Sequence, residues 1–308
     1  MLLCSLDWLE FTVKKFVLLS DLLEYINFPK DNFIQLPKGL YGYRSMIKHE
    51  EFPIYIMFDG SESMAIHVRI SGSAIDFFLD NWKCDAQTGI TKISEIGDFT
   101  RLDIALDDYG GEYFRIPNIY RYLRSDSYIA KFRHYSIVRM YDTESNSKTG
   151  DTIYLGKRSS NIFFRIYDKR LETIHKLNED PGTEITRWEL ESKHESAQNL
   201  ADLIICFGLQ NAFQAVLRNS FTLIHKDATR KTRCTTLKKY DEFLEHVPGA
   251  KISKSKKILS LDQTIHWLVN QCSKAYALAV YKESGFADRL LGSGIDKLTE
   301  NDLNRLKY

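Results

Sequence analysis

Three segments of the chain alternate strictly between polar and apolar residues, and they limit the possible folds more than any other feature: residues 100–108, 161–169 and 185–193. Successive side chains of a β-strand point to opposite faces, so each segment predicts a strand with one apolar and one polar face. In the first segment the apolar face consists of Leu102, Ile104 and Leu106. Antiparallel sheets with one face on the core and one face in solvent have this pattern.

The stretches around these segments indicate the rest of the architecture. Residues 116–124 and 169–177 predict helices, and residues 195–219 and 260–283 carry apolar residues at the helical spacing of three and four. We therefore expect an α+β fold, with an antiparallel β-sheet, helices on one of its faces and further helices at the C-terminal end. The expected regions are a sheet-bearing one over residues 1–200 and a helical one over residues 201–308, packed as one unit.

Charge is distributed unevenly, although the net charge of the chain is only +1. Between Lys226 and Lys257, ten Lys or Arg residues stand against four acids, which gives 10 − 4 = +6. This basic segment, residues 226–257, is a candidate for phosphate contacts, but charge runs are more often a solvated surface.

Composition excludes several classes of protein. No run of ~18 uncharged apolar residues is present, and the first residues lack the basic stretch of a secretory signal, so we expect a cytoplasmic protein without a membrane span. The five cysteines are scattered and form no CxxC pair, which argues against a disulfide framework and against a structural zinc site.

The polar faces of the three predicted strands contain a restricted set of residue types. The first carries Arg101, Asp103 and Asp107, and the third carries Arg187, Glu189 and Glu191. Short acidic residues in rows repel each other unless a cation lies among them, and carboxylate oxygens suit Mg²⁺ or Mn²⁺. The pattern therefore predicts a divalent-metal site, and the alternative is the ordinary solvated face of an antiparallel sheet.

The second segment adds a nucleophile to this set. Arg165, Tyr167 and Lys169 share its polar face. A tyrosine hydroxyl titrates near ~10, so it needs neighbouring cations to attack at neutral pH, and arginine can also clamp a phosphate. An enzyme that forms a phosphotyrosine bond with DNA requires this combination. Because the chain has 17 tyrosines, Tyr167 alone would carry no argument.

Several separated motifs resemble one family. The stretch TIYLGKRSSNIFFRIYDK (152–169), together with TRLDIALDD (100–108) and ITRWELE (185–191), is similar to the Rep_trans family of rolling-circle plasmid replication initiators and integrative-element relaxases. The residues that carry the resemblance are Tyr154, Gly156, Arg158 and Ser160 before the strand, and Arg165, Tyr167 and Lys169 within it.

The resemblance implies a fold and an activity. The fold is that of a Rep or relaxase nickase, and the activity is metal-dependent, strand-specific nicking and religation of DNA at an origin. The tyrosine that matches Tyr167 attacks one phosphodiester and stays joined to the 5′ phosphate, with Arg165 and Lys169 beside it. A divalent metal is implied on acidic residues of neighbouring strands, which we assign to Asp103 and Glu189 first and to Asp107 and Glu191 second.

The resemblance also implies partners. We expect origin DNA, double-stranded with a single-stranded region at the nick, a host helicase and a homodimer. The expected DNA contacts are basic residues of the strands, of the motif that precedes the Tyr167 strand and of the basic segment: Arg101, Arg158, Arg187, Lys231, Arg233, Lys238 and Lys239. Two alternatives stay open: a non-catalytic origin-binding regulator with the same fold, and a metal-dependent nuclease that uses water.

Overall fold

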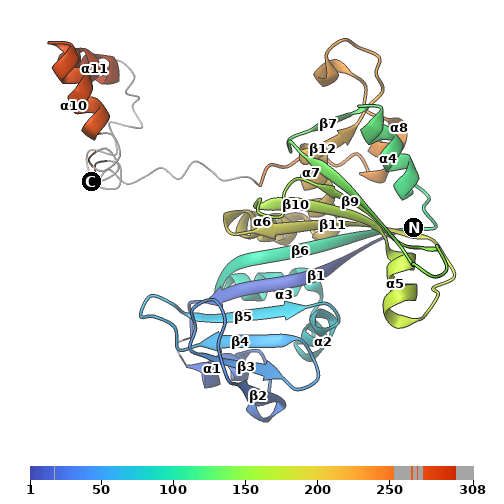
Figure 1. Cartoon of the computed structure of the whole chain (residues 1–308). Coiled ribbons are helices and arrows are strands. Elements are labelled where there is room, and N and C mark those ends of the chain that lie inside the picture. Colours follow the sequence, from blue (N-terminus) through green and yellow to red (C-terminus); the bar gives the residue numbers. More distant parts are fainter. Residues whose placement is uncertain (17, 253–264, 266–268, 270–272, 296–308) are drawn as a thin grey trace. The chain divides into compact units, whose positions relative to one another are not determined.

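The structure is a computed structural model, and it describes residues 1–16, 18–252, 265, 269 and 273–295 (Figure 1). The chain splits into two compact units, Met1–Ser253 and Lys254–Tyr308. The predicted boundary after residue 200 falls inside a helix of the first unit. Of the basic segment, residues 253–257 lie outside the described residues, as do most of residues 260–272 of the last predicted helical stretch.

A large antiparallel sheet organises the first unit. In the described part of the chain it has ten strands, and every neighbouring pair is antiparallel. In spatial order the strands are β2 (Phe33–Leu36), β3 (Ser45–His49), β4 (Ile54–Phe58), β5 (Ile66–Ser71), β1 (Leu2–Val13), β6 (Gly97–Tyr109), β11 (Ile185–Lys193), β10 (Ile162–Asp168), β9 (Lys148–Leu155) and β8 (Tyr135–Tyr141). The three alternating segments are thus β6, β10 and β11, which lie side by side.

Helices connect and cover these strands. Those of the first unit are α1 (Leu19–Tyr25), α2 (Ala74–Asn81), α3 (Ala86–Ser94), α4 (Ile116–Arg124), α5 (Lys169–Leu177), α6 (Glu195–Phe207), α7 (Leu209–Ser220) and α8 (Lys238–Phe243), with short 3₁₀ turns at Lys30–Asn32 and Lys231–Arg233. A small second sheet pairs β7 (Tyr128–Ala130) with β12 (Phe221–Leu223). The predicted helices at 116–124 and 169–177 are confirmed as α4 and α5.

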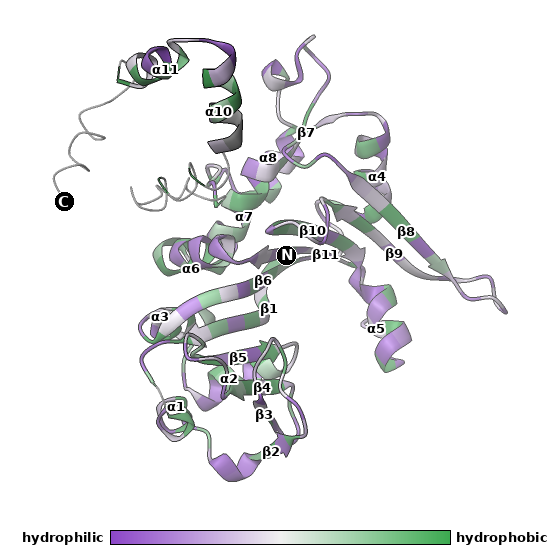
Figure 2. Cartoon of the chain, turned by 60° about the vertical axis from the view of Figure 1, so that its left-hand side comes forward, coloured by the Kyte–Doolittle hydropathy of each residue, from purple (hydrophilic) through white to green (hydrophobic). Residues whose placement is uncertain are grey.

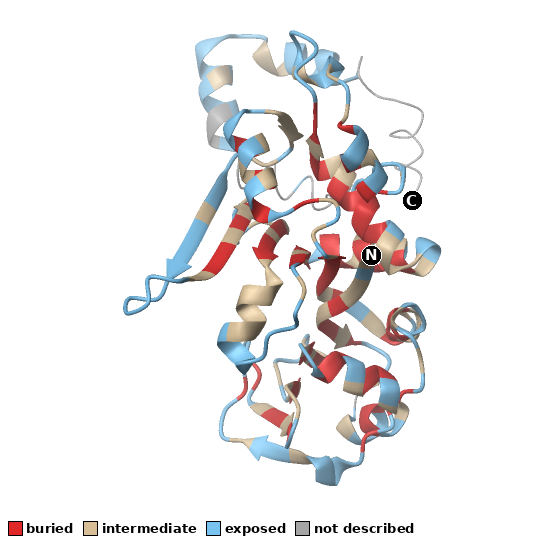
Figure 3. Cartoon of the chain, turned by 90° about the vertical axis from the view of Figure 1, so that its right-hand side faces the viewer, coloured by how far each residue is buried: buried red, intermediate tan, exposed pale blue. Residues whose placement is uncertain are grey.

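The apolar face of the sheet forms the core. Leu102, Ile104 and Leu106 are fully buried, and they belong to one hydrophobic cluster with Phe78 of α2 and Phe213 of α7. Hydrophobic residues run through α7 (Figure 2), and the buried residues concentrate in the central strands and the helices against them (Figure 3). The predicted α+β fold, an antiparallel sheet with helices on one face, is confirmed.

Two features of the first unit were not predicted. The stretch 195–219 is broken into α6 and α7 at Gly208, whose φ of 80° lies in the left-handed region that favours glycine. Strands β8 and β9 form a hairpin at the edge of the sheet, and most β8 side chains are exposed (Figure 3).

Within the second unit the structure describes α10 (Ser273–Lys282) and α11 (Phe286–Ile295). In the described residues, no helix combines the length and the hydrophobicity that a membrane span needs.

Candidate active site

The predicted site residues of β6, β10 and β11 lie on one face of the sheet. Arg165 and Tyr167 of β10 pair in register with Glu189 and Arg187 of β11. Arg187 and Glu191 of β11 pair in turn with Asp107 and Asp103 of β6. Residues directly opposite each other in an antiparallel pair have Cβ atoms about 4.5–5.5 Å apart, so these side chains are neighbours. We call this set the polar row: Arg165, Tyr167, Arg187, Glu189, Glu191, Asp103, Asp107 and Arg101.

Ion pairs hold the polar row together. The guanidinium group of Arg165 lies 2.5 Å from Glu189, and that of Arg187 lies 2.7 Å from Asp107. At the other end of the row, Arg101 bridges two carboxylates, with nitrogen-to-oxygen distances of 2.6 Å to Asp103 and 2.9 Å to Glu191. Lys193 also reaches Glu191, at 2.5 Å. Each of the four carboxylates predicted to bind metal therefore has a basic partner in this structure.

Tyr167 lies at the β10 end of the polar row and is 6% exposed. The centre of its ring is 4.9 Å from Arg165 Cζ and 5.9 Å from Lys169 Nζ, so both predicted cations lie beside it. Burial strongly raises the pKa of the Tyr167 phenol, and the negative charge of Glu189 raises it further; Arg187 and Arg165 oppose this to a smaller extent. The phenol is therefore protonated at neutral pH in this arrangement.

A pocket of about 300 Å³ gives access to Tyr167. Strand β9 contributes Thr152 and Tyr154 to its lining, and helix α5 contributes Glu172, His175 and Lys176. Helix α5 follows the tyrosine strand directly, because β10 ends at Asp168 and α5 begins at Lys169. Within the helix, Lys169 donates a hydrogen bond of 2.7 Å to Glu172. Helix α5 thus borders the polar face at the position of the tyrosine.

Sequence reasoning missed Asp7, which joins the polar row from β1. Arg187 Nη1 lies 3.4 Å from Asp7 Oδ1. Strict alternation would place Asp7 on the same face as Leu9 and Phe11, which are buried in the core. The pairing of β1 with β6 has a register shift between Leu6 and Trp8. This irregularity turns the Asp7 side chain towards the polar face. The available signal was a lone carboxylate in a row of alternate residues that carries no other charge.

The predicted DNA-binding residues divide into two groups. Arg101 and Arg187 lie in the polar row, and the exposed Arg158 lies close to it, since its carbonyl accepts a hydrogen bond of 2.9 Å from Lys193. The second group does not join the row. Lys238 and Lys239 lie on α8, whose Phe243 packs on Trp188 with ring centres 5.1 Å apart.

Trp188 points to the opposite face of β11 from Arg187 and Glu189. Helix α8, which packs on Trp188, is therefore separated from the polar row by the sheet. The remaining two residues of the second group, Lys231 and Arg233, form a 3₁₀ turn in which Lys231 pairs with Asp126. The structure therefore does not bring the described part of the basic segment, residues 226–252, to the polar row.

The donor set suits a divalent cation in chemistry, but it is not arranged as a cation cage. In and beside the polar row, carboxyl groups outnumber basic groups by 5 − 4 = 1: Asp7, Asp103, Asp107, Glu189 and Glu191 face Arg101, Arg165, Arg187 and Lys193. Burial raises the pKa of Asp103 to about 8, although Arg101 opposes this. The described residues contain no group of three or more His, Cys, Asp or Glu placed to hold a metal ion. Bound metal would therefore require an arginine to release a carboxylate.

Comparison with known proteins places the chain in a family. The sequence profile described as "Replication initiation factor", Rep_trans, matches residues 97–292, which include β6, β10 and β11. The chain belongs to this replication initiation factor family. The predicted resemblance is thereby confirmed. Asp7 lies outside the matched residues of the Rep_trans profile.

One relative and one solved structure bear on the Rep_trans assignment. The chain is 26% identical over 189 residues to "Putative DNA relaxase NicK" of Bacillus subtilis (strain 168), a match that includes 59% of this chain and 53% of the relative. The chain thus spans about half the length of that relative. A rolling circle replication initiator protein from Geobacillus stearothermophilus has the same fold: the TM-score is 0.71 with 24% identity, over 83% of this chain and 100% of that one.

Proposed function

We propose that this chain nicks and rejoins one strand of DNA at an origin of rolling-circle replication or transfer, with Tyr167 as the nucleophile. The family and the similar proteins named above support the reaction class, since their descriptions are a replication initiation factor, a DNA relaxase and a rolling circle replication initiator. The observation that carries the proposal is the position of Tyr167, between two arginines of a charged row and at the wall of a pocket.

The proposed step exchanges one phosphodiester for another. The Tyr167 oxygen attacks the phosphorus atom, the bond from phosphorus to the 3′ oxygen breaks, and a 5′ phosphotyrosine bond forms. The phenolic proton leaves to solvent, and the released 3′ oxygen takes up a proton to become a free hydroxyl. No water is consumed, so the same bond is restored when a 3′ hydroxyl attacks the phosphotyrosine.

Arg165, Lys169 and Arg187 favour this step. Arg165 and Lys169 each place a positive charge beside the Tyr167 ring, and Arg187 lies opposite Tyr167 on the neighbouring strand β11. Positive charge in a partly desolvated site stabilises both the phenolate and the extra negative charge of the phosphoryl transition state. In the described arrangement Glu189 opposes ionisation of the phenol, so any process that neutralises Glu189 favours attack.

A divalent cation, Mg²⁺ or Mn²⁺, is the second part of the proposal. Asp103 and Glu189 are the first candidates to hold it, followed by Asp107 and Glu191. When bound, such a cation would polarise the scissile phosphate and offset the charge that develops on it. The excess of carboxylates over basic groups in the polar row supports this assignment.

Origin DNA is the proposed substrate, and a host helicase and a homodimer stay predictions. A second candidate function is a DNA-binding regulator with the same fold. It is favoured by two observations: Tyr167 is buried, and each predicted metal ligand is paired with a basic residue. The two proposals differ in one property, because only the nickase leaves DNA joined to the protein.

A denaturing gel separates the candidates. The full chain is incubated with Mg²⁺ and a labelled supercoiled plasmid that carries the gene of this protein and the DNA that flanks the gene. The Tyr167→Phe protein serves as the matched variant. A labelled band that moves with the wild-type protein and is missing for Tyr167→Phe supports the nickase. Cleaved DNA without such a band indicates hydrolysis by water. Intact DNA on this gel, together with a shifted band on a native gel of the same mixture, indicates the regulator.

A further inference from the structure

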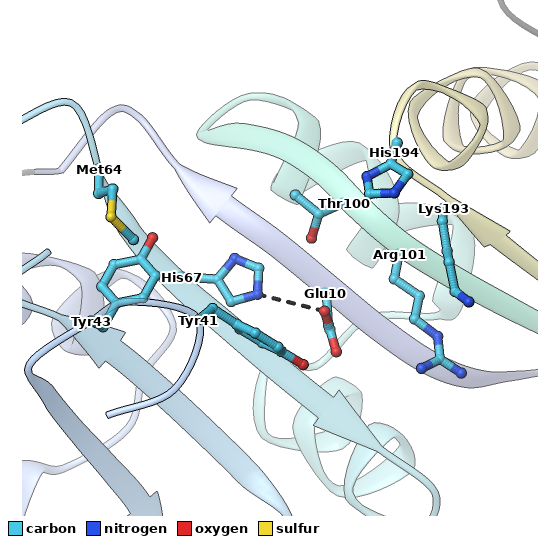
Figure 4. Close-up of a pocket in the computed structure, with 9 residues that line it drawn as sticks. All are labelled: Glu10, Tyr41, Tyr43, Met64, His67, Thr100, Arg101, Lys193 and His194. Carbon is cyan, nitrogen blue, oxygen red and sulfur yellow. Dashed lines mark ion pairs between the residues drawn. The ribbon is translucent and has the colours of Figure 1, made fainter. Parts of the chain in front are cut away.

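A second pocket, of about 380 Å³, opens on the polar face at the other end of the polar row (Figure 4). Its size falls within the ~300–1,000 Å³ of typical ligand pockets. The lining residues come from β1, β5, β6, the end of β11 and two loops: Glu10, Tyr41, Tyr43, Met64, His67, Thr100, Arg101, Lys193 and His194. The first five of these lie outside the residues that the family profile matches, so the assignment to the family gives them no role.

Aromatic rings form one wall of this pocket. Tyr43 stacks on His67 with ring centres 6.2 Å apart, and Tyr41 meets the same imidazole edge-on at 5.7 Å. The Tyr43 hydroxyl donates a hydrogen bond of 2.6 Å to the Ala65 carbonyl, which fixes the ring. Tyr41, by contrast, is 59% exposed and has a φ of 54°, which a residue with a side chain rarely adopts. The loop therefore holds a large apolar ring open to solvent at the rim of the pocket.

Buried polar groups line the floor. Glu10 and His67 are both buried, and Glu10 Oε1 accepts a hydrogen bond of 2.8 Å from Trp8. Glu10 Oε2 lies 3.6 Å from His67 Nε2, which is beyond hydrogen-bond distance (Figure 4). Among the described residues, His67 Nε2 and Thr100 Oγ1 find no hydrogen-bond partner. Buried polar atoms without partners are rare in folded proteins, so these atoms are suited to bind a polar ligand.

Positive charge lies on the side of the pocket that faces the polar row. Arg101 and Lys193 line the pocket and at the same time pair with Glu191. His194 precedes α6, so the N-terminal end of this 13-residue helix also borders the pocket. Lys193 lies six positions after Arg187, the neighbour of Tyr167, on β11, which corresponds to roughly 20 Å along the strand. The pocket and Tyr167 therefore lie on the same face of the sheet, at a separation that several nucleotides of a single strand would span.

We propose that this pocket binds one unpaired nucleotide of the substrate strand, with its base stacked on Tyr41 and its phosphate toward Arg101 and Lys193. The exocyclic amino group of the base donates to Glu10 Oε2, which selects cytosine, adenine or guanine over thymine. Sequence-tolerant stacking on aromatic rings beside a basic path is how proteins hold single strands. A metal ion is a poorer occupant, because the described residues, Glu10, His67 and His194 of this pocket included, contain no group of three or more His, Cys, Asp or Glu placed to hold one.

This inference rests on the proposed function, since it assumes a DNA substrate. Its test measures binding without cleavage. Fluorescein-labelled oligodeoxycytidylate and oligodeoxythymidylate are titrated with the full chain, and fluorescence anisotropy gives the Kd. We expect the wild type to bind oligodeoxycytidylate more tightly. Tyr41→Ala should weaken that binding about tenfold or more, because stacking on one base is lost, whereas Tyr41→Phe should stay within about twofold.

Two controls make the result specific. Tyr141→Ala removes a tyrosine of similar exposure, 54%, on the β8–β9 hairpin, and should leave the Kd unchanged within about twofold. Glu10→Gln should abolish the preference for oligodeoxycytidylate over oligodeoxythymidylate. The amide would present an NH₂ group, a donor, to the amino group of cytosine, which is also a donor. Photocrosslinking with 5-iododeoxycytidine in the oligonucleotide should label the peptide that contains Tyr41.

Unchanged affinity in Tyr41→Ala, or crosslinks confined to other peptides, would overturn the pocket assignment. That failure is distinguishable from failure of the proposed function. If Tyr167 forms a covalent DNA adduct while the Tyr41 variants bind normally, only the pocket assignment is wrong. If the pocket behaves as expected but Tyr167 forms no adduct, the nucleotide site stands and the nickase does not.

Discussion

Arg165 and Glu189 face each other across β10 and β11, with Arg165 Nη2 at 2.7 Å and 2.5 Å from the two carboxylate oxygens of Glu189. The Glu189 side chain is almost fully buried, and Arg165 is about one-third exposed. On β10, Arg165 is two residues from Tyr167, and on the other side of the pair Glu189 lies opposite Ala105 of β6. The pair therefore occupies the middle of the polar row. Its geometry governs both the charge around the tyrosine and the availability of Glu189 for a cation.

The Arg165–Glu189 pair should show strong energetic coupling. Removal of one partner leaves the other desolvated and unpaired, so Arg165→Met and Glu189→Met should each lower the free energy of unfolding by about 1–3 kcal/mol. The double variant should lose less than the sum, with a coupling of at least about 1 kcal/mol. Urea denaturation of the four proteins measures the cycle. Additivity within about 0.3–0.5 kcal/mol would show that the pair does not form as described.

Glu172 should make stability depend on pH in the acid range. Burial alone would raise the pKa of Glu172, but hydrogen bonds from Lys169 and Lys176 outweigh it and lower the pKa to about 2. A carboxyl whose pKa is depressed in the folded state stabilises the fold above its unfolded pKa of about 4.3, and this contribution is lost as pH falls from there towards the folded pKa.

The expected size of this contribution is on the order of 1–2 kcal/mol, less than full linkage would give because the pair is partly open to solvent. Urea midpoints of the wild type and Glu172→Gln at pH 6 and at pH 3 test it. The difference between the two proteins should shrink at the lower pH. A difference that stays constant would mean that Glu172 is not held by the two lysines.

The polar row should bind one divalent cation with its carboxylates. We expect titration calorimetry with Mn²⁺ alone to show saturable binding to the full chain, and Asp103→Asn to weaken it about tenfold or more because a charged ligand is lost. Asp98→Asn changes an exposed aspartate on the same strand, paired with Lys14, and is the matched control. EDTA should stop nicking as well. Equal Mn²⁺ affinity of wild type and Asp103→Asn, or full nicking in excess EDTA, would exclude this metal site.

Periodicity predicted much of the fold because it depends on local sequence. The alternating segments became β6, β10 and β11, and the apolar face of each strand is buried in the core. Pairing order is a non-local property, and strict alternation cannot reveal that β1 lies between β5 and β6 or that a bulge turns Asp7 outward. The same limit explains why the pocket at Tyr41 and His67 escaped notice, since it joins residues from distant segments.

The candidate site was predictable in its residues but not in its electrostatics. Alternation places Arg165 opposite Glu189 only when the register of two strands is known, and a shift by one residue would separate them. The expected rows of repelling acids are in fact compensated by arginines from neighbouring strands. Helix α5 was predicted from its own sequence, but its place beside Tyr167 depends on tertiary packing.

The identity of the residue that becomes joined to DNA tests the central claim most directly. The adduct formed with the origin-bearing plasmid is digested with nuclease and protease, and the peptide that retains a nucleotide is sequenced by mass spectrometry. The account predicts a 5′ phosphate on Tyr167 and no adduct in Tyr167→Phe at unchanged thermal stability. A nucleotide on another residue, such as Tyr154 in the same pocket, or an adduct that persists in Tyr167→Phe, would contradict it.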